Sequence, residues 1–425
     1  MKIYKNPTQS QWAEIIERPS IDNTILLKNV GKILSDVKKG GDRAVRKYSK
    51  KFDGISSKKI KIGEKEIKKG IADVSDELKH AIKVAAENIR VFHSPQMESS
   101  PRIETIKGVE CWRKSVGIER VGIYIPGGSA PLFSTVLMLG IPAQIAGCKH
   151  VILCTPPSKD GKVHPAILYA ASLVGISEIY ACGGAQAIAS MAYGTESIKK
   201  VDKIFGPGNQ YVTAAKQLVQ LEGTAIDMPA GPSEVCVLAD QTSNPAFLAA
   251  DLLSQAEHGP DSQVLLVTTS LKILNDTIEQ LNIQVKSLPR NQIAQKSLEN
   301  SRAVLLENMD DALSLVNAYA AEHLIIASDD AEHIADKVVN AGSVFLGNLT
   351  PESAGDYASG TNHTLPTNGH ARAYSGVSVD SFVRKITFQK ITHEGIRLLG
   401  PTIIEMAQAE QLDAHANAVK IRLNQ

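Results

Sequence analysis

Three Ala-Glu-His tripeptides are the segments of this chain best suited to do chemistry. They occupy residues 256–258, 321–323 and 331–333. An adjacent carboxylate and imidazole can bind a metal ion, transfer a proton or simply lie on the surface of a helix. The surroundings of each copy distinguish these possibilities.

The first tripeptide ends a predicted helix that an Asn-Pro pair opens and a Gly-Pro pair closes. Gln255 and His258 are three residues apart, so both project from one face of the last turn. An amide oxygen and an imidazole at that spacing can chelate a divalent ion, whereas Glu257 points elsewhere. A surface Gln and His without a metal is the commoner outcome, so the spacing alone leaves both readings open.

Further metal donors lie in two distant segments. The loop 350–376 is rich in Gly, Ser, Thr and Asn and offers Asp356 and His363, and the C-terminal helix offers Glu410 and His415. A site with two imidazoles, one carboxylate and one amide suits Zn²⁺ and, by ligand softness, Mn²⁺. Because it lacks thiolates, such a site is typical of a catalytic metal with open positions. Composition alone does not bring these segments together.

The second tripeptide places Glu322 and His323 between a predicted helix and the apolar strand "LIIAS". Charged residues pressed against a buried strand are poor choices for packing. Burial shifts their pKa values toward neutrality, which suits general acid–base catalysis. The alternative is a helix C-terminus that favours a protonated histidine.

The third tripeptide places Glu332 and His333 in the first turn of a predicted helix capped by Ser328 or Asp329. Acidic residues there complement the helix dipole. We expect this copy to be solvated and to do no chemistry.

Three turns rich in Gly and Pro indicate a nucleotide site: "YIPGGSAP", "CGGAQA" and "FGPGNQ". Each follows a predicted strand, and glycines let backbone N–H groups approach a phosphate at the start of the next helix. Tyr124, Gln186 and Asn209 would add side-chain contacts. The G-x-G-x-x-G fingerprint is absent, and each turn by itself can be read as a tight strand-to-helix connection.

Short β-branched runs alternating with Ala-rich helical stretches predict two α/β domains with parallel sheets. The runs are "VGIYI", "HVILC", "EIYAC" and "VDKIF", followed by "EVCVLAD", "SQVLLVTT", "AVLLEN", "HLIIAS" and "SVFLGN". Residues 1–115 read mostly as helices, and "VDSFVRKITFQKIT" begins like a strand. The predicted division is a helical segment 1–22, an α/β domain of 23–125 plus 234–376, an α/β domain 126–233, and a C-terminal segment 377–425.

Composition predicts an ordinary cytoplasmic globular protein. The 425 residues are 43% hydrophobic and 21% charged, and 46 basic against 45 acidic residues leave no nucleic-acid or anionic-membrane signature. The first twenty residues have no secretory signal, and no stretch has the length of a membrane span. Five scattered cysteines without a C-x-x-C pair fit a reducing compartment.

Taken together, the motifs resemble the histidinol dehydrogenase family over roughly residues 25–420. The resemblance is carried by "YIPGGSAPLFSTVLM", "GGAQAIA", "KIFGPGN", "DMPAGPSE", "DLLSQAEHGPDSQ", "NAYAAEHL", "GDYASGTNHTLPT" and "AEQLDAHANAV". One departure is "AEQLDAH", where the family more often has Glu-Gly-Leu-x-x-His. The spacing from Glu410 to His415 is kept.

The resemblance implies an NAD-dependent oxidation of L-histidinol through the aldehyde to L-histidine, the last step of histidine biosynthesis. It implies one zinc per subunit, two incomplete Rossmann-like domains, and a homodimer with an exchanged C-terminal segment that carries Glu410 and His415 into the neighbouring site. The implied roles are zinc ligands Gln255, His258, Asp356 and His415; catalytic residues Glu322 and His323; substrate contacts Ser233 and Glu410 beside the ligands and the catalytic pair; and NAD contacts Tyr124, Gln186 and Asn209.

Three alternatives use the same residues differently. A thiol mechanism would need Cys111 or Cys148 as the nucleophile. A metal-dependent hydrolase or lyase on an α/β frame would make the Gly-rich turns merely structural. A non-enzymatic nucleotide-binding protein would leave Asp356 and its polar loop unexplained.

Overall fold

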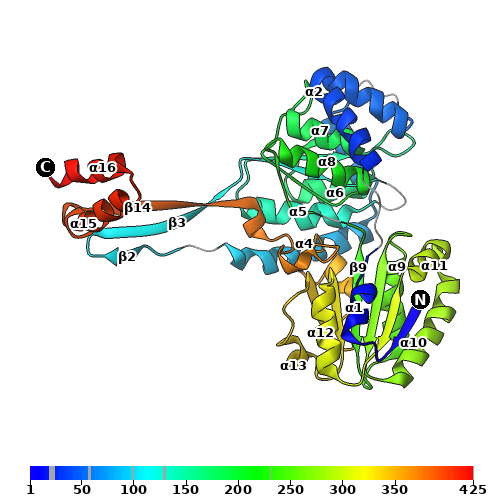
Figure 1. Cartoon of the computed structure of the whole chain (residues 1–425). Helices are drawn as coiled ribbons and strands as arrows, with labels where there is room; N and C mark the ends of the chain where they lie inside the picture. The colour runs from blue at the N-terminus through cyan, green and yellow to red at the C-terminus, as the bar shows by residue number, and fades with distance from the viewer. Residues whose placement is uncertain (19–23, 56–58, 98–99, 128–130, 230, 425) are drawn as a thin grey trace.

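The computed structural model of this chain has two α/β lobes and one long arm (Figure 1). It describes residues 1–425 except 19–23, 56–58, 98–99, 128–130, 230 and 425. The lobes are named here by their sheets, as the five-stranded and the six-stranded lobe. Both sheets are parallel, as the alternating strand and helix pattern predicts.

The five-stranded sheet has the order β6-β5-β4-β7-β8. Its faces are covered by helices whose apolar side chains form two separate buried clusters, one on each face. The four runs predicted as strands in this region form β4 to β7. The elements are β4 (Arg120–Tyr124), α5 (Phe133–Ile145), β5 (His150–Thr155), α6 (Pro165–Leu173), β6 (Glu178–Ala181), α7 (Gly184–Tyr193), β7 (Lys203–Phe205), α8 (Gln210–Leu221) and β8 (Ala225–Ile226).

The N-terminal helices pack on the five-stranded lobe, which differs from the predicted domain division. These helices are α2 (Thr24–Phe52), α3 (Glu64–Ala72) and α4 (Asp76–His93). A buried apolar stripe on α2, from Leu26 to Val37, packs with α7 and α8. The expected grouping of 23–125 with 234–376 therefore fails for these helices and for β4, because this apolar stripe covers a face of the five-stranded sheet.

The six-stranded sheet has the order β1-β11-β10-β9-β12-β13. All five runs predicted as strands after residue 233 form strands in it, and the three central strands are buried throughout. Residues 2–5 add an edge strand that the sequence analysis read as part of a helical segment. The elements are β1 (Lys2–Lys5), α1 (Gln9–Ile15), β9 (Glu234–Ala239), α9 (Pro245–Ala256), β10 (Gln263–Thr268), α10 (Leu271–Gln284), α11 (Asn291–Glu299), β11 (Arg302–Leu305), α12 (Met309–Tyr319), β12 (His323–Ala327), α13 (Ala331–Ala335), β13 (Ser343–Leu346) and α14 (Glu352–Tyr357).

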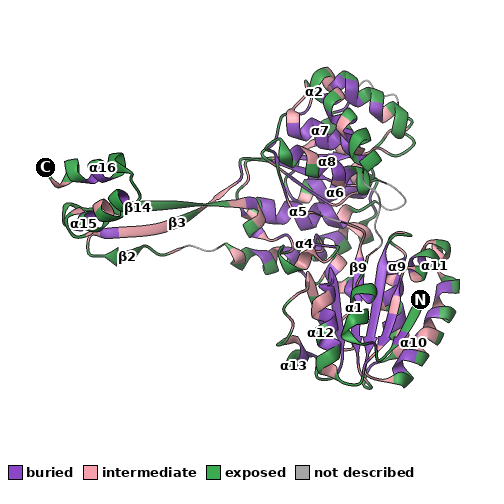
Figure 2. Cartoon of the chain, in the orientation of Figure 1, coloured by how far each residue is buried: buried purple, intermediate pink, exposed green. Residues whose placement is uncertain are grey.

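The arm is an antiparallel sheet that extends away from both lobes and carries the C-terminal helices at its far end (Figure 1). Its strands are β2 (Ile103–Ile106), β3 (Val109–Gly117) and β14 (Val383–Ile391), followed by α15 (His393–Ala409) and α16 (Asp413–Leu423). The helical reading of 103–117 was wrong, whereas the strand predicted near 383 is present. Much of the arm is exposed (Figure 2), including the side chains of Ile386, Phe388 and Met406.

The root of the arm is fixed to the five-stranded lobe. Phe382 is fully buried there and stacks on Phe205 with ring centroids 4.0 Å apart. Short 3-10 helices complete the fold: Ser94–Gln96, Val285–Ser287, His370–Arg372 and Val379–Phe382. Within the described ranges, no helix is long and apolar enough to cross a membrane.

Candidate active site

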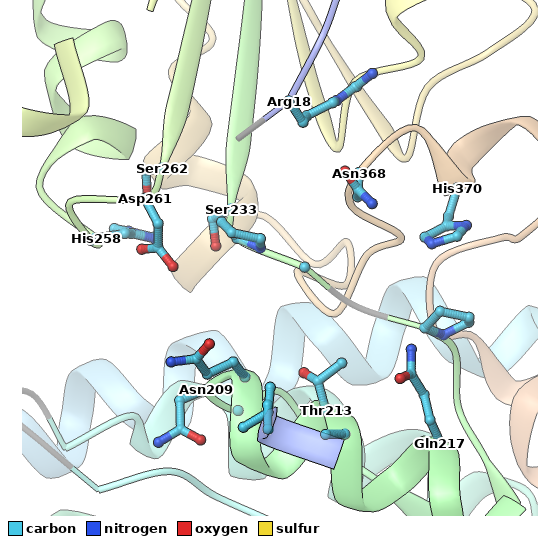
Figure 3. A pocket seen from close by; sticks show the side chains of 18 of the residues that line it. Arg18, Asn209, Thr213, Gln217, Ser233, His258, Asp261, Ser262, Asn368 and His370 are labelled. Carbon is cyan, nitrogen blue, oxygen red and sulfur yellow. The ribbon is translucent and has the colours of Figure 1, made fainter. Parts of the chain in front are cut away.

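A cleft with a volume of about 560 Å³ separates the two lobes. One side is the start of α8, with Asn209 and Thr213, just beyond the carboxyl end of β7 (Figure 3). The other side includes Ser233 and Ser262, which immediately precede β9 and β10, together with His258. The carboxyl edge of one parallel sheet thus faces the amino edge of the other. A cavity of this size accommodates a small-molecule ligand.

Glu322 and His323 lie at the amino end of β12 and are almost completely buried, with exposed fractions of 6% and 3%. The backbone of Glu234, at the start of β9, contacts both side chains. Its N–H donates to Glu322 Oε2 at 3.0 Å, and its carbonyl oxygen lies 3.3 Å from His323 Nδ1. A proton on Nδ1 therefore satisfies that carbonyl and leaves Nε2 as the free acceptor. Nε2 is buried and has no hydrogen-bond partner among the described residues.

Arg18 holds the side chain of Glu234 and was missed by the sequence analysis. Its Nε and Nη2 donate to the two carboxylate oxygens of Glu234, both at 2.9 Å. Nη2 also donates to the carbonyl of Tyr319 at 2.6 Å, and the guanidinium lies 3.9 Å from the centroid of the Tyr319 ring. This bidentate pair fixes the strand end that positions the catalytic candidates. Nothing near Arg18 in the sequence marks it, because its partners are more than 200 residues away.

Two carboxylates from α14 complete the surroundings of His323. Asp356 Oδ1 lies 3.5 Å from Nε2, and Glu352 Oε1 lies 3.8 Å from Nδ1. Glu352 is 1% exposed, and neither of its oxygens has a hydrogen-bond partner in the described part of the chain. Glu352 and Asp356 are four residues apart, so the short helix α14 presents both on one face. Residues 350–376 were predicted to form a loop, so nothing in the sequence singled out Glu352.

The charges around His323 shift several pKa values. Burial raises the pKa of Glu322 and of Glu352, each to about 8. Burial alone would lower the pKa of His323, but the negative charges of Glu352, Glu322 and Asp356 raise it to about 10. The expected move toward neutrality thus holds for Glu322, whereas the pKa of His323 moves the other way because three carboxylates surround one imidazole.

The end of α9 brings Gln255 and His258 to the same site. Gln255 Nε2 lies 3.3 Å from His258 Nδ1, so the predicted i, i+3 pair does share a face. Gln255 Oε1 is buried and has no partner within the described residues. α14 packs against α9. Burial lowers the pKa of His258, and Asp356 lies close enough for its negative charge to oppose that shift. Three of the four predicted metal ligands therefore converge.

These residues fit a divalent cation. An amide oxygen without a partner, an imidazole and a carboxylate make a donor set that Zn²⁺ accepts. His323, Glu352 and Asp356 also form a group whose potential ligand atoms all lie within 4.8 Å of one another. His363 offers no free nitrogen, since Nδ1 lies 2.7 Å from the Asp356 carbonyl and Nε2 lies 3.0 Å from Thr135 Oγ1. The excess of buried carboxylates is the electrostatic setting that a cation would neutralise.

Glu410 and His415 are not near this cluster in the single chain. Both are exposed and lie at the far end of the arm, at the end of α15 and in α16 (Figure 1). Within one chain, therefore, the fourth predicted metal ligand and one predicted substrate contact stay apart from the others.

The predicted nucleotide residues lie along the carboxyl edge of the five-stranded sheet. Asn209 caps α8 by accepting from the backbone N–H groups of Tyr211 and Val212, and it lines the cleft. Tyr124 is buried and its hydroxyl accepts from the Gly184 N–H at 3.0 Å. Gln186 is 1% exposed, and both atoms of its amide group are buried without partners in the described regions. Residues 128–130 of the first turn lie outside the described residues.

The remaining candidates lie in unsuitable surroundings. Glu332 and His333 are exposed on α13, beyond the opposite end of β12 from His323. Burial raises the pKa of the Cys148 thiol to about 11, so a thiolate is disfavoured there. Cys111 lies on β3 in the arm. These positions give no support to the thiol mechanism.

Comparisons with known proteins agree with the family resemblance. A family model described as histidinol dehydrogenase matches residues 16–423. The histidinol dehydrogenase of Bacteroides thetaiotaomicron is 60% identical over 424 residues, covering 100% of this chain and 99% of the relative. The chloroplastic histidinol dehydrogenase of Arabidopsis thaliana is 51% identical, with 100% and 91% covered. A crystal structure of histidinol dehydrogenase from Elizabethkingia anophelis superposes with a TM-score of 0.98 at 57% identity, with 100% and 98% covered.

Asp251, one turn before Gln255, tests the electrostatics of this cluster. Burial raises the pKa of its carboxyl group to about 7. A raised carboxyl pKa means that the folded state binds the proton more tightly, so stability is lost as pH rises from about 4 toward 7. We expect Asp251→Asn to be more stable than the wild type at pH 8, by at most about 4 kcal/mol, and to lose this advantage near pH 4.

The measurement is urea unfolding of both proteins at several pH values in the presence of a chelator. Asp73→Asn, at an exposed position, is the control. A difference between wild type and Asp251→Asn that does not change with pH would contradict the assignment of a buried, protonated carboxyl group.

Proposed function

This chain belongs to the histidinol dehydrogenase family, and we propose that the cleft between its lobes is where L-histidinol is oxidised through L-histidinal to L-histidine. The family consists of NAD-dependent oxidoreductases, and this reaction is the last step of histidine biosynthesis. Because the family consists of oxidoreductases, the alternative of a metal-dependent hydrolase or lyase is excluded. The observation that carries the proposal is the buried Glu322–His323 pair beside Asp356 and His258, where His258 lines the cleft together with Asn209 of the other lobe.

The proposed zinc ligands are Gln255, His258 and Asp356 of one subunit and His415 of a second copy of this chain. The convergence of α9 and α14 and the unpartnered amide oxygen of Gln255 support the first three. Zinc, when bound, would supply a Lewis acid with positions for the imidazole and amino nitrogens of histidinol. Ser233 lines the cleft and is proposed as a substrate contact, together with Glu410 of the second copy.

His323 is proposed as the proton acceptor in both oxidations. Its Nδ1–H points to the Glu234 carbonyl, so Nε2 takes the proton of the substrate hydroxyl. Glu352, on the Nδ1 side, then stabilises the imidazolium. NAD, when bound, would supply the hydride acceptor for both oxidations. Tyr124, Gln186 and Asn209 are proposed to contact it.

Glu322 is proposed to act between the two oxidations. The ionised form of Glu322, whose raised pKa makes it a stronger base than an exposed carboxylate, takes a proton from water, and the hydroxyl adds to the aldehyde carbon. The imidazolium of His323 returns the proton of the first oxidation to the aldehyde oxygen, which completes the hydrate and leaves Nε2 free again. The hydrate then loses a hydroxyl proton to His323 as the second hydride leaves.

A homodimer with exchanged arms would complete this site. The arm carries Glu410 and His415 far from their own cleft and exposes apolar side chains along β14 and α15. Packing these side chains against a second copy would bury them. For the compartment we propose the reducing cytoplasm, because all five cysteines are free.

Removing a metal ligand tests the zinc site. We expect His258→Asn to lower zinc content and turnover together, each by on the order of tenfold or more, because an imidazole ligand is lost. Zinc is measured by atomic emission on the purified protein, and turnover as NADH per histidinol consumed. His333→Asn, in the exposed third tripeptide, is the matched control. Full turnover in a zinc-free His258→Asn protein would remove zinc from the scheme.

The two catalytic residues should have separable effects. We expect His323→Asn to slow the oxidation of both histidinol and histidinal by roughly 10² to 10⁴. Glu322→Gln should slow histidinal oxidation more than histidinol oxidation, because only the aldehyde needs an activated water. Single-turnover assays with each substrate measure the two steps, with Glu332→Gln as control. Equal losses in both steps for Glu322→Gln would overturn this division of roles.

Mixed dimers test the exchange of arms. Chains with His258→Asn and chains with His415→Asn should each be inactive alone. In a mixed dimer one site holds both substitutions and the other holds neither, so random mixing should restore about a quarter of wild-type activity. Co-expression with two affinity tags isolates the mixed species. No recovery in a dimer shown to contain both chains would mean that His415 serves its own subunit.

A further inference from the structure

Asp53 is a half-buried acidic residue that has no role in the proposed mechanism. It immediately follows α2, and its backbone N–H donates to the Ser49 carbonyl at 2.9 Å. Its Oδ2 is buried and has no hydrogen-bond partner among the residues that the structure describes. Burial raises the pKa of this carboxyl group. A carboxylate oxygen that is shielded from water and unpaired has a cost that a ligand donating hydrogen bonds would remove.

The neighbours of Asp53 belong to the proposed nucleotide edge. Asp53 lies close enough to Tyr124 and Cys182 for its negative charge to disfavour ionisation of both side chains. Tyr124 is the last residue of β4, and Cys182 lies just beyond β6. The Tyr124 hydroxyl accepts from Gly184, the first residue of α7. Two residues further along α7 lies Gln186, whose buried amide also has no partner in the described chain. Two polar groups without partners among the described residues thus lie near the start of α7. One is Asp53 Oδ2, which follows α2, and the other is the amide of Gln186 in α7.

Their place in the sheet indicates which half of the cofactor they would meet. The cleft with His258 and Ser233 lies beside Asn209, after β7. The strand order β6-β5-β4-β7 puts β6 three strands away from β7, or about 14 Å at the usual strand spacing. With the nicotinamide at the cleft, the adenosine half extends toward β4 and β6, where Asp53 lies.

We propose that Asp53 is the residue that selects NAD over NADP, by accepting hydrogen bonds from the vicinal hydroxyls of the adenosine ribose. An ionised carboxylate only accepts hydrogen bonds, and a vicinal diol offers two O–H donors to it. A 2′-phosphate at the same place would bring like charges together and would lose a donor. This assignment rests on the proposed NAD site at the carboxyl edge of the five-stranded sheet.

Cofactor binding tests the assignment without the reaction. Kd values for NAD and NADP are measured by titration calorimetry on the full-length protein, for wild type and for Asp53→Asn. We expect the wild type to prefer NAD strongly. Asp53→Asn should weaken NAD binding by roughly tenfold to a hundredfold and narrow the NAD-to-NADP ratio by a similar factor. Asp73→Asn, exposed on the same lobe, is the control and should change neither Kd.

The ratio separates a contact with the ribose from a structural role. A structural role would weaken NAD and NADP equally, and that outcome overturns the proposal. Asp53→Ser, a smaller side chain, gives the same readout if the Asn variant folds poorly. Gln186→Ala is measured in parallel. Weaker NAD binding in Gln186→Ala with unchanged binding in Asp53→Asn overturns only the role of Asp53, whereas unchanged binding in both also overturns the proposed NAD edge.

Discussion

The site depends on the burial of three carboxylates around one imidazole. Glu322, Glu352 and Asp356 all lie within 4 Å of the ring nitrogens of His323, and the first two are fully enclosed by protein. Such an arrangement is costly unless positive charge compensates it. In the single chain the positive charge comes from the protonated imidazole of His323. The three carboxylates raise the pKa of this imidazole, so it is already protonated and is a poor proton acceptor. Neutralising Asp356 with a divalent cation would return His323 toward the neutral form that the proposed chemistry needs.

The two parallel sheets contribute different parts of the site, because one faces the cleft with its carboxyl edge and the other with its amino edge. The carboxyl edge of the five-stranded sheet offers glycine-rich turns and helix N-termini, which suit an anionic dinucleotide. The amino edge of the six-stranded sheet offers side chains held by strand backbone, as Glu234 holds Glu322 and His323. Rigid strands, anchored by the Arg18–Glu234 pair, hold these side chains more precisely than a loop would. The fold therefore joins a glycine-rich binding edge to a catalytic edge whose side chains are held by strand backbone.

Local patterns in the sequence predicted most strands of both sheets, although not β1 and β8, and the pairing of Gln255 with His258, because both depend on spacing within one element. They also placed Glu322 and His323 at the start of a buried strand. What they missed depends on contacts between distant segments. Arg18 reaches Glu234 across 216 residues, and Glu352 becomes visible only when α14 packs on α9. The helices of residues 24–93 were grouped with the wrong sheet because an amphipathic stripe does not say which sheet it covers. The roles of the zinc and NAD contacts still rest on the family resemblance.

The arm shows most clearly why one chain is an incomplete description of this site. Residues 383–391 form a strand that is mostly exposed, yet Ile386 and Phe388 lie two residues apart on one face of it. Apolar side chains such as Ile386 and Phe388 are exposed on it, which is unfavourable in water unless another surface covers them. The far end of the arm carries the exposed His415, while Gln255 keeps a buried amide oxygen without a partner among the described residues. The strand leaves apolar side chains uncovered, and the cluster leaves polar atoms without partners in the described part of the chain. In the proposed dimer, a second copy of the chain would cover the first and contribute His415 to the second.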